Sequence, residues 1–245
     1  MSAACNMTEK NSIINKLSKK LFRRRTQMGK GLVVTIDGPA GAGKSTVAKK
    51  VAAGLGVPYL DSGAIYRAIT WYMLRAGIPA EESGALEAAL GSLFFEITKN
   101  GISVNGRDVS KEIRTPEIDK NVSPYSALKI VRNSILDIQR AQDKNGIVAD
   151  GRDMGTVVYP NADLKIFLTA DAEERAKRRY EERIAKGESA DYEQILEQVK
   201  ARDEYDMNRE IAPLRPAENC VVIDSTQMNA DEVASAIAQL ARSLR

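Results

Sequence analysis

Residues 38–45 read Gly-Pro-Ala-Gly-Ala-Gly-Lys-Ser, and this octapeptide constrains the fold more than any other part of the chain. It matches the pattern G-x-x-x-x-G-K-[ST], in which glycines let the backbone wrap a phosphate so that successive N–H groups point inward. The β-branched run at 32–36 predicts a buried strand before the octapeptide, and the segment from Lys44 predicts a helix over 44–54. The positive end of that helix would also face the phosphate. We therefore expect a strand, a loop and a helix built around a nucleoside triphosphate.

Two side chains of the octapeptide add chemistry to its backbone. Lys44 is expected to reach the outer phosphates of the nucleoside triphosphate, and the Ser45 hydroxyl is expected to ligate Mg²⁺. A glycine-rich turn that carries a surface lysine is the alternative, and the flanking strand and helix favour the nucleotide. The predicted ATP-binding residues are Gly38, Pro39, Ala40, Gly41, Ala42, Gly43, Lys44, Ser45 and Thr46.

The composition excludes several kinds of chemistry. The 245 residues include no histidine, which excludes Ser-His-Asp catalysis, Cys-His catalysis and histidine-ligated zinc. The two cysteines, Cys5 and Cys220, are too few for a disulfide framework, so a reduced, cytoplasmic protein is expected. No apolar run approaches the roughly 18 residues that a transmembrane helix needs. Any catalysis must then come from carboxylates, Lys, Arg, hydroxyls, backbone amides and metal.

Positive charge is concentrated at the start of the chain. Residues 1–30 contain eight Lys or Arg residues and one acid, Glu9, whereas the whole chain has a net charge of +3. The remainder is therefore mildly acidic, and nucleic-acid binding by the body of the protein is not expected. We interpret residues 1–30 as a disordered extension, with Met28 opening the folded part. An organellar transit peptide and a nucleic-acid-binding tail are the alternatives.

From residue 32 onward, short apolar segments alternate with helical segments, which is typical of an α/β fold with a parallel sheet and helices on both faces. The alternation breaks at 94–109, where two Asn-Gly pairs between apolar runs predict an antiparallel hairpin. We expect a small insert at about 80–120 that projects from a core of 31–79 and 121–245. Strands are predicted at 32–36, 57–60, 147–150, 164–169 and 220–223, and helices at 44–54, 63–76, 124–143, 172–186, 191–207 and 230–243.

Two polar clusters directly follow predicted strands, where ligands gather in open α/β sheets. In the cluster at 61–67, Ser62 could cap the next helix, and Arg67 could bind a phosphate through two guanidinium nitrogens. In the cluster at 150–156, Asp150 is placed to act on Mg²⁺ through the metal's other ligands. A surface arginine beside a helix cap and an ordinary glycine-containing turn are the respective alternatives.

Two later helices carry further candidates. Arg202, Asp206 and Arg209 share one helix face, which could be a ligand-binding face or a solvated face with an internal ion pair. The helix at 173–183 contains Glu-to-basic pairs four residues apart, as an ordinary charged helix does. Its arginines could instead close over the transferring phosphate as a mobile lid at about 173–190. The lid candidates are Arg175, Arg178 and Arg179.

Four stretches together resemble the bacterial cytidylate kinases, a family of nucleoside-monophosphate kinases. They are Thr-Ile-Asp-Gly-Pro-Ala-Gly-Ala-Gly-Lys-Ser (35–45), Asp-Ser-Gly-Ala-Ile-Tyr-Arg (61–67), Asp-Gly-Arg-Asp-Met-Gly-Thr (150–156) and Arg-Asp…Asn-Arg-Glu-Ile-Ala-Pro-Leu (202–214). The similarity covers about residues 32 to 245. It implies transfer of the ATP γ-phosphoryl group to CMP or dCMP with Mg²⁺. It also implies a five-stranded parallel P-loop core, a separate CMP-binding insert and a short helical lid.

The resemblance also implies an acceptor site. An aspartate beside an arginine suits cytosine, which presents an amino donor next to two acceptors. The residues expected to recognise the base are Ser62, Arg132 and Asp153, with Arg209 nearby; those near the ribose are Ser123, Arg202 and Asp206; those at the acceptor phosphate are Arg67 and Arg152. Tyr66 is expected to line the pocket. The expected catalytic residues are Lys44, Arg152 and Arg202, and no strong general base is needed because the attacking phosphate oxygen is already anionic.

Other functions stay open on the sequence. A kinase for UMP, AMP, shikimate or a similar acceptor would share the phosphate loop. A P-loop GTPase switch or a regulatory ATPase would share it too, although guanine recognition normally needs an Asn-Lys-x-Asp element, which we do not find. The basic residues 1–30 could bind nucleic acid. The expected protein is a monomer without a membrane partner.

Overall fold

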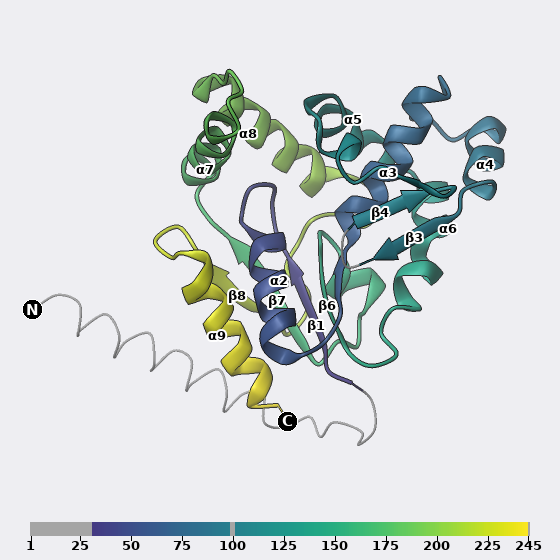
Figure 1. Ribbon diagram of the computed structural model, residues 1–245. Coiled ribbons are helices and arrows are strands. Elements are labelled where there is room, and N and C mark those ends of the chain that lie inside the picture. Colours follow the sequence, from purple (N-terminus) through teal and green to yellow (C-terminus); the bar gives the residue numbers. More distant parts are fainter. Residues whose placement is uncertain (1–30, 99–100, 245) are drawn as a thin grey trace, which may run out of the picture.

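A computed structural model describes residues 31–98 and 101–244 of the chain. The proposed extension at 1–30 lies outside the described residues. Five parallel strands form the central sheet in the order β2-β6-β1-β7-β8 (Figure 1). The strands are β1 (Val33–Asp37), β2 (Tyr59–Asp61), β6 (Ile147–Gly151), β7 (Leu164–Thr169) and β8 (Val221–Asp224). The predicted five-stranded parallel sheet is confirmed.

Helices cover both faces of this sheet because the buried strands present apolar side chains on both sides. Val34 and Ile36 of β1 pack on one face with α2 (Lys44–Leu55) and α9 (Ala230–Arg242). Val33 packs on the other face, in a cluster that includes residues of α3 (Ser62–Arg75). The two-residue period of β1 therefore serves two separate hydrophobic clusters.

The predicted hairpin is confirmed and is part of a larger substructure. β3 (Phe95–Thr98), β4 (Gly101–Val104) and β5 (Arg107–Asp108) form a three-stranded antiparallel sheet. A helix that we did not predict, α4 (Gly84–Gly91), precedes it, and Ser83 caps this helix by accepting a hydrogen bond from Leu86 N at 3.2 Å. A 3₁₀ turn, η1 (Glu112–Arg114), follows the sheet.

The single helix predicted at 124–143 is wrong. The chain forms two helices there, α5 (Pro116–Ala127) and α6 (Lys129–Arg140), because Leu128 between them adopts an extended conformation with ψ 134°. α5 begins earlier than predicted, with Thr115 as its N-cap and Pro116 in its first turn. A Thr-Pro pair is a recognised helix start, so the sequence carried this signal.

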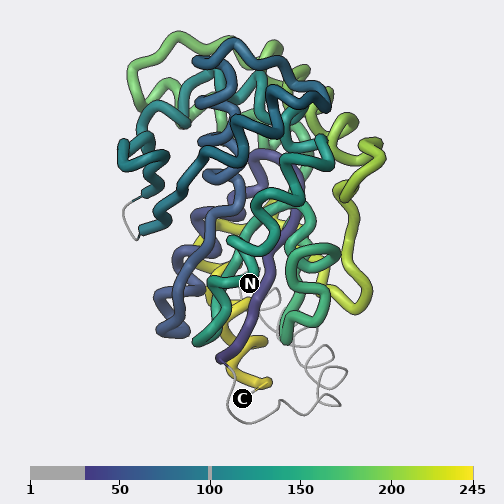
Figure 2. The backbone as a smooth tube through the Cα atoms, turned by 90° about the vertical axis from the view of Figure 1, so that its right-hand side faces the viewer, coloured from purple at the N-terminus to yellow at the C-terminus, as the bar shows by residue number. Residues whose placement is uncertain are grey.

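The remaining α-helices, α7 (Ala172–Ala185) and α8 (Tyr192–Asn208), pack against each other beyond the sheet. Figure 2 shows that these helices and the antiparallel insert occupy one end of the molecule, whereas the end of α9 lies at the other. β1 runs toward the first end and delivers the loop at 38–43 there. The carboxyl ends of the parallel strands thus meet the insert and α7–α8, where an open α/β sheet places its ligands.

Candidate active site

The loop between β1 and α2 has the backbone that a phosphate cradle requires. Gly38, Gly41 and Gly43 have φ values of 152°, 79° and 81°, a region that side chains other than glycine rarely adopt. At Gly38 a Cβ would also lie 1.9 Å from the carbonyl oxygen of Leu168. Residues 41–46 line a cleft of about 720 Å³ at the N-terminus of α2. The loop therefore has the geometry of an anion site at a helix N-terminus.

Lys44 and Ser45, the two reactive side chains of this loop, meet polar groups of the neighbouring elements. Lys44 is buried and its Nζ donates to the carbonyl oxygen of Pro39 at 2.7 Å. Burial lowers the pKa of Lys44 well below its ordinary value, and the positive charge of Arg152 adds to this. The Ser45 hydroxyl donates to Asp150 Oδ2 at 3.0 Å, while the hydroxyl of Tyr59 donates to Asp150 Oδ1 at 2.7 Å.

The Ser45–Asp150 pair fits Mg²⁺. Both side chains offer hard oxygen atoms, the ligands that this ion prefers, and both lie beside the loop expected to hold the phosphates. Burial and, to a smaller extent, the negative charge of Asp61 raise the pKa of Asp150 to about 6, although the positive charge of Lys44 opposes the shift. A divalent cation beside this carboxyl group would favour its ionised form.

A second, smaller cavity of about 50 Å³ lies next to the cleft. A buried ion pair between Arg132 of α6 and Asp153 forms one wall. Arg132 also donates to the carbonyl oxygen of Ser126 at 2.9 Å, and its guanidinium lies 5.4 Å from the ring centroid of Tyr66. The cavity is lined by Ser62, Gly63, Tyr66, Arg67, Val122, Ser126, Arg132, Gly151, Arg152, Asp153, Arg202, Asp206 and Arg209.

The structure thus brings together nine of the ten residues predicted for the acceptor. Arg152 Nε donates to Asp206 Oδ2 at 2.9 Å, so the carboxylate of α8 pairs with the loop after β6 rather than with Arg202 one turn earlier on its own helix. Burial lowers the pKa of Arg202 to about 10, and the charge of Arg152 contributes. Several cationic groups therefore share a poorly solvated space, which suits a polyanionic ligand.

Two predictions about serines differ from the structure. Ser62 does not cap α3: the cap is Asp61, whose side chain accepts from Ala64 N at 2.9 Å, and the Ser62 hydroxyl donates to the carbonyl oxygen of Asp150 at 2.6 Å. Ser123 is buried in α5 and does not line the small cavity, whereas Ser126 of the next turn does. The two serines are three residues apart on nearly the same face of α5, and the sequence could not fix which one lines the cavity.

The loop that carries Arg152 and Asp153 is held by a residue that we did not single out. Asp37, the last residue of β1, accepts hydrogen bonds from Met154 N at 2.8 Å and from Gly155 N at 2.7 Å. Burial raises the pKa of this carboxyl group to about 7, and the two amide donors partly oppose that shift. Asp37 adjoins Gly38, so one residue connects the phosphate loop to the smaller cavity.

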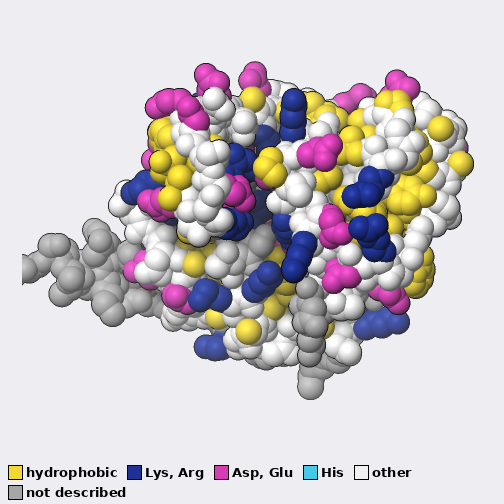
Figure 3. All heavy atoms as spheres, turned by 45° about the horizontal axis from the view of Figure 1, so that its top comes forward, with side chains coloured by type: hydrophobic (Ala, Val, Ile, Leu, Met, Phe, Trp, Pro, Cys, Tyr) yellow, Lys and Arg dark blue, Asp and Glu magenta, His cyan; other side chains and the backbone are white. Residues whose placement is uncertain are grey.

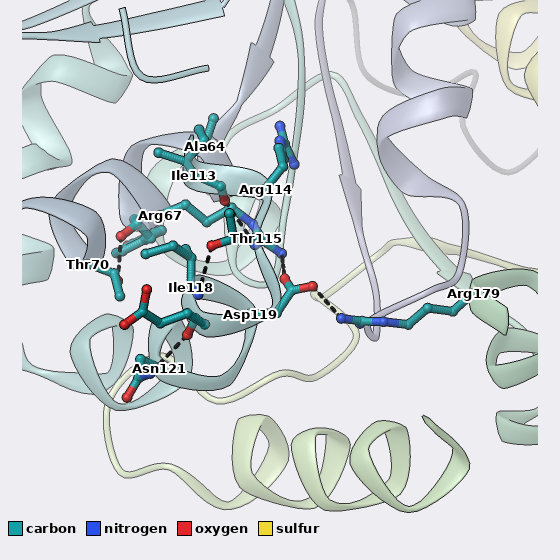
Figure 4. Close-up of polar contacts among 12 residues, drawn as sticks. Ala64, Arg67, Thr70, Ile113, Arg114, Thr115, Ile118, Asp119, Asn121 and Arg179 are labelled. Atoms are coloured by element: carbon teal, nitrogen blue, oxygen red, sulfur yellow. Dashed lines mark hydrogen bonds and ion pairs between the residues drawn. The ribbon is translucent and has the colours of Figure 1, made fainter. Parts of the chain in front are cut away.

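Basic side chains line the large cleft, and Figure 3 shows them as a dark-blue group in the hollow between two raised parts of the surface. Arg178 donates to Glu174 Oε1 at 2.9 Å and to the carbonyl oxygen of Ser225 at 2.7 Å. Arg179 extends from α7 toward Asp119 of α5, with which it forms an ion pair (Figure 4). Both arginines line the cleft, as expected for lid candidates.

Arg175 differs from that expectation. It is buried and does not line the cleft. Its guanidinium donates to the carbonyl oxygens of Ala170 at 2.8 Å and Ala40 at 2.9 Å, and it pairs with Asp203 at 2.6 Å. Arg175 therefore supports the phosphate loop from outside the cleft instead of reaching into it.

Residues of the insert also reach the cleft, and the sequence reasoning did not find them. Arg114 forms an ion pair with Asp61, and Asp119 forms ion pairs with Arg67 and Arg179. Arg114 and Asp119 are isolated charged residues in a segment that contains no motif, so the local sequence does not indicate their ion-pair partners. Only the approach of η1 and α5 to the ends of β2 and α3 brings them there.

The strand, glycine loop and helix, with the adjoining cavity at the carboxyl ends of the strands, define a P-loop protein. A family model described as cytidylate kinase matches residues 34–243. The chain is 45% identical over 218 residues to a cytidylate kinase of an Exiguobacterium species, covering 87% of this chain and 97% of that protein. It is 46% identical over 213 residues to a cytidylate kinase of Pasteurella multocida, covering 84% and 93%. The chain belongs to the cytidylate kinase family.

A solved structure supports the fold independently. An uncharacterised protein of Eubacterium ventriosum aligns with a TM-score of 0.52 at 14% identity, covering 87% of this chain and 99% of that chain. This likeness concerns the fold alone. Within the described ranges 31–98 and 101–244, we find no helix with the length and hydrophobicity of a membrane span.

Proposed function

We propose that the protein transfers the γ-phosphoryl group of ATP to the phosphate of CMP or dCMP. The observation that carries this proposal is the small cavity walled by the Arg132–Asp153 pair, which meets the cleft of the phosphate loop. Arg67 lines both the cleft and this cavity, so the two spaces meet at one guanidinium. A nucleotide bound in the cleft and a second one bound in the small cavity would point their phosphates toward each other.

The acceptor base would be read by hydrogen bonds in the small cavity. The Asp153 carboxylate can accept from the amino group of cytosine, and Arg132 can donate to its ring nitrogen or carbonyl oxygen. Uracil carries a carbonyl in place of the amino group and would set two acceptors against each other. Sites that hydrogen-bond a buried polar edge discriminate by about 10⁴ between such analogues.

The reaction needs positioning and charge stabilisation more than proton transfer. An anionic oxygen of the acceptor phosphate attacks the γ-phosphorus, the bond from that phosphorus to the β–γ bridging oxygen breaks, and ADP leaves with the electron pair. Lys44 in the cleft and Arg152 and Arg202 in the small cavity would stabilise the charge of the transferring group, with Arg178 and Arg179 contributing from α7. The Ser45 hydroxyl would hold Mg²⁺ with Asp150 beside it, and the bound ion would supply further charge neutralisation.

The residues divide into three working parts under this proposal. The core, 31–79 and 121–245, holds ATP; the insert at about 80–120 contributes to the acceptor side; and 173–190 forms the lid. The boundary at 120 falls inside α5, so the insert and the core share that helix. The protein is expected to act as a monomer in the cytoplasm, without nucleic-acid or membrane partners.

The test is ADP release from MgATP with CMP, dCMP, UMP, AMP, shikimate or no acceptor, each in a separate reaction. We expect rapid turnover with CMP and dCMP only, and a loss of at least about 10²-fold in kcat for Lys44→Ala, which removes the charge nearest the phosphates. Preference for another acceptor would contradict the cytosine assignment. Equal ADP release without any acceptor would indicate an ATPase or a switch protein instead.

A further inference from the structure

Asp119 lies on α5 at the rim of the large cleft and contacts arginines from two other helices. Its Oδ1 forms an ion pair with Arg67 of α3, and its Oδ2 forms one with Arg179 of α7. Figure 4 shows the carboxylate between the two side chains, with Arg179 approaching from the opposite side of the view. One carboxylate therefore connects three helices around the candidate active site.

The contact with Arg67 constrains a guanidinium that has few other partners. The Arg67 side chain is only 15% exposed, and a charge this poorly solvated needs an opposite charge nearby. Burial lowers the pKa of Arg67, whereas Asp119 acts to raise it. Besides this ion pair, Arg67 Nη1 donates to the carbonyl oxygen of Ile113 at 3.4 Å. These contacts engage both terminal nitrogens of a group with five N–H donors, and within residues 31–98 and 101–244 donors remain that can bind a phosphate.

The contact with Arg179 reaches across the cleft. Arg179 lies on α7, and α7 also carries Arg178, which lines the cleft with the phosphate loop. The Asp119 side chain is 22% exposed, and burial acts to raise its pKa; the charges of Arg67, Arg179 and Arg202 outweigh this and hold the pKa below the ordinary value. The carboxylate is therefore ionised at neutral pH and can attract both arginines together.

We propose that Asp119 is a positioning residue that orients Arg67 toward the acceptor phosphate and holds Arg179 of α7 over the cleft. Asp119 has no direct contact with substrate in this role; it acts through the two arginines. The inference rests on the proposed function, because it assigns Arg67 to the acceptor phosphate. An opposite role would follow if the carboxylate competed with phosphate for the same arginines, and the sign of the effect on CMP binding separates the two.

The kinetic test compares Asp119→Asn with the wild-type protein. Asparagine preserves the size of the side chain and removes its charge. We expect the KM for CMP to rise about tenfold, which corresponds to one charged hydrogen bond, with a smaller change in the KM for ATP. Asp119→Glu keeps the negative charge, so its KM for CMP should lie between those of Asp119→Asn and the wild-type protein. Glu117→Gln removes an exposed carboxylate from the same helix and should leave both constants within about twofold of wild type. An unchanged or lower KM for CMP in Asp119→Asn overturns the inference.

Hydrogen exchange provides a second arm that needs no acceptor. Without nucleotide, peptides from 172–185 should exchange faster in Asp119→Asn and in Arg179→Met than in Glu117→Gln, because the contact that holds α7 is lost. The double variant should exchange no faster than either single variant if Asp119 and Arg179 act on α7 through each other. If peptides from 172–185 exchange at the same rate in Asp119→Asn and Arg179→Met as they do in the Glu117→Gln control, the cross-cleft contact is refuted. If the wild-type protein fails to phosphorylate CMP but these differences appear, the proposed function is wrong and the contact is real.

Discussion

Replacing Asp37 by asparagine should change how the stability of the protein depends on pH. The carboxyl group is buried, and burial raises its pKa to about 7 from an ordinary value of 3.8. The negative charge of Asp153 adds to the rise, while Lys44 and the two amide donors of the 153–155 loop oppose it. In the folded protein the carboxyl group therefore binds its proton more tightly than it does in the unfolded chain.

The sign follows from this difference in proton binding. Between pH 3.8 and about 7 the folded state holds a proton that the unfolded state has released, so stability is present at low pH and is lost as the pH rises through this window. From pH 4.5 to 7.5 the expected loss of free energy of unfolding from this one group is roughly 3 kcal/mol. The asparagine that replaces Asp37 cannot titrate, so the variant lacks this contribution to the loss.

The measurement is urea unfolding of the wild-type protein and of Asp37→Asn at several pH values from 4.5 to 7.5. Asparagine places an –NH₂ donor where the protonated carboxyl group has its hydroxyl, so one of the two backbone amide donors faces another donor and the variant should lose about 1–3 kcal/mol at low pH. The variant's free energy of unfolding does not change with the titration of this group, whereas that of the wild-type protein falls as the pH rises. The difference in free energy of unfolding between the two proteins should therefore shrink as the pH rises. Asp137→Asn, at an exposed position on α6, is the control. Parallel curves for wild type and Asp37→Asn would refute the reasoning about the buried carboxyl group.

Two further predictions test other parts of the site. Asp153→Asn should raise the KM for CMP more than the KM for ATP and should lower the melting temperature, because Arg132 loses its buried partner; an unchanged KM for CMP would remove Asp153 from the acceptor site. Gly38→Ala should cost at least about 2 kcal/mol in urea unfolding, because its Cβ would lie 1.9 Å from a backbone oxygen. Gly54→Ala, where a Cβ meets no atom within 4 Å, should stay within about 1 kcal/mol of wild type, and equal effects at both glycines would contradict the steric argument.

Local patterns in the sequence were sufficient for the elements that bury apolar side chains regularly. The β-branched run at 32–36 predicted β1, and the Asn-Gly pairs predicted the antiparallel hairpin, because both signals lie within a few residues. The helix break at Leu128 was missed, since its extended conformation comes from no residue type that forces it. The Thr-Pro start of α5 was available and was not used.

The backbone geometry of the phosphate loop was determined by the sequence itself. Its glycines lie within one octapeptide with Lys44 and Ser45, and the proposed roles of these two residues depend on a turn that the glycines' own backbone preferences build. The resemblance of four short stretches was likewise enough for the family, which the comparisons show. These conclusions required no knowledge of how distant segments pack.

The tertiary structure alone decided which distant side chains meet. Asp37 accepts from amides more than a hundred residues away, and Asp119 joins Arg67 to Arg179 across the cleft. Arg175 and Arg179 lie on one charged helix, yet one supports the phosphate loop from outside and the other faces the cleft. Such contacts depend on the relative placement of strands and helices, and the charge of a residue gives its capacity for an ion pair without giving its partner.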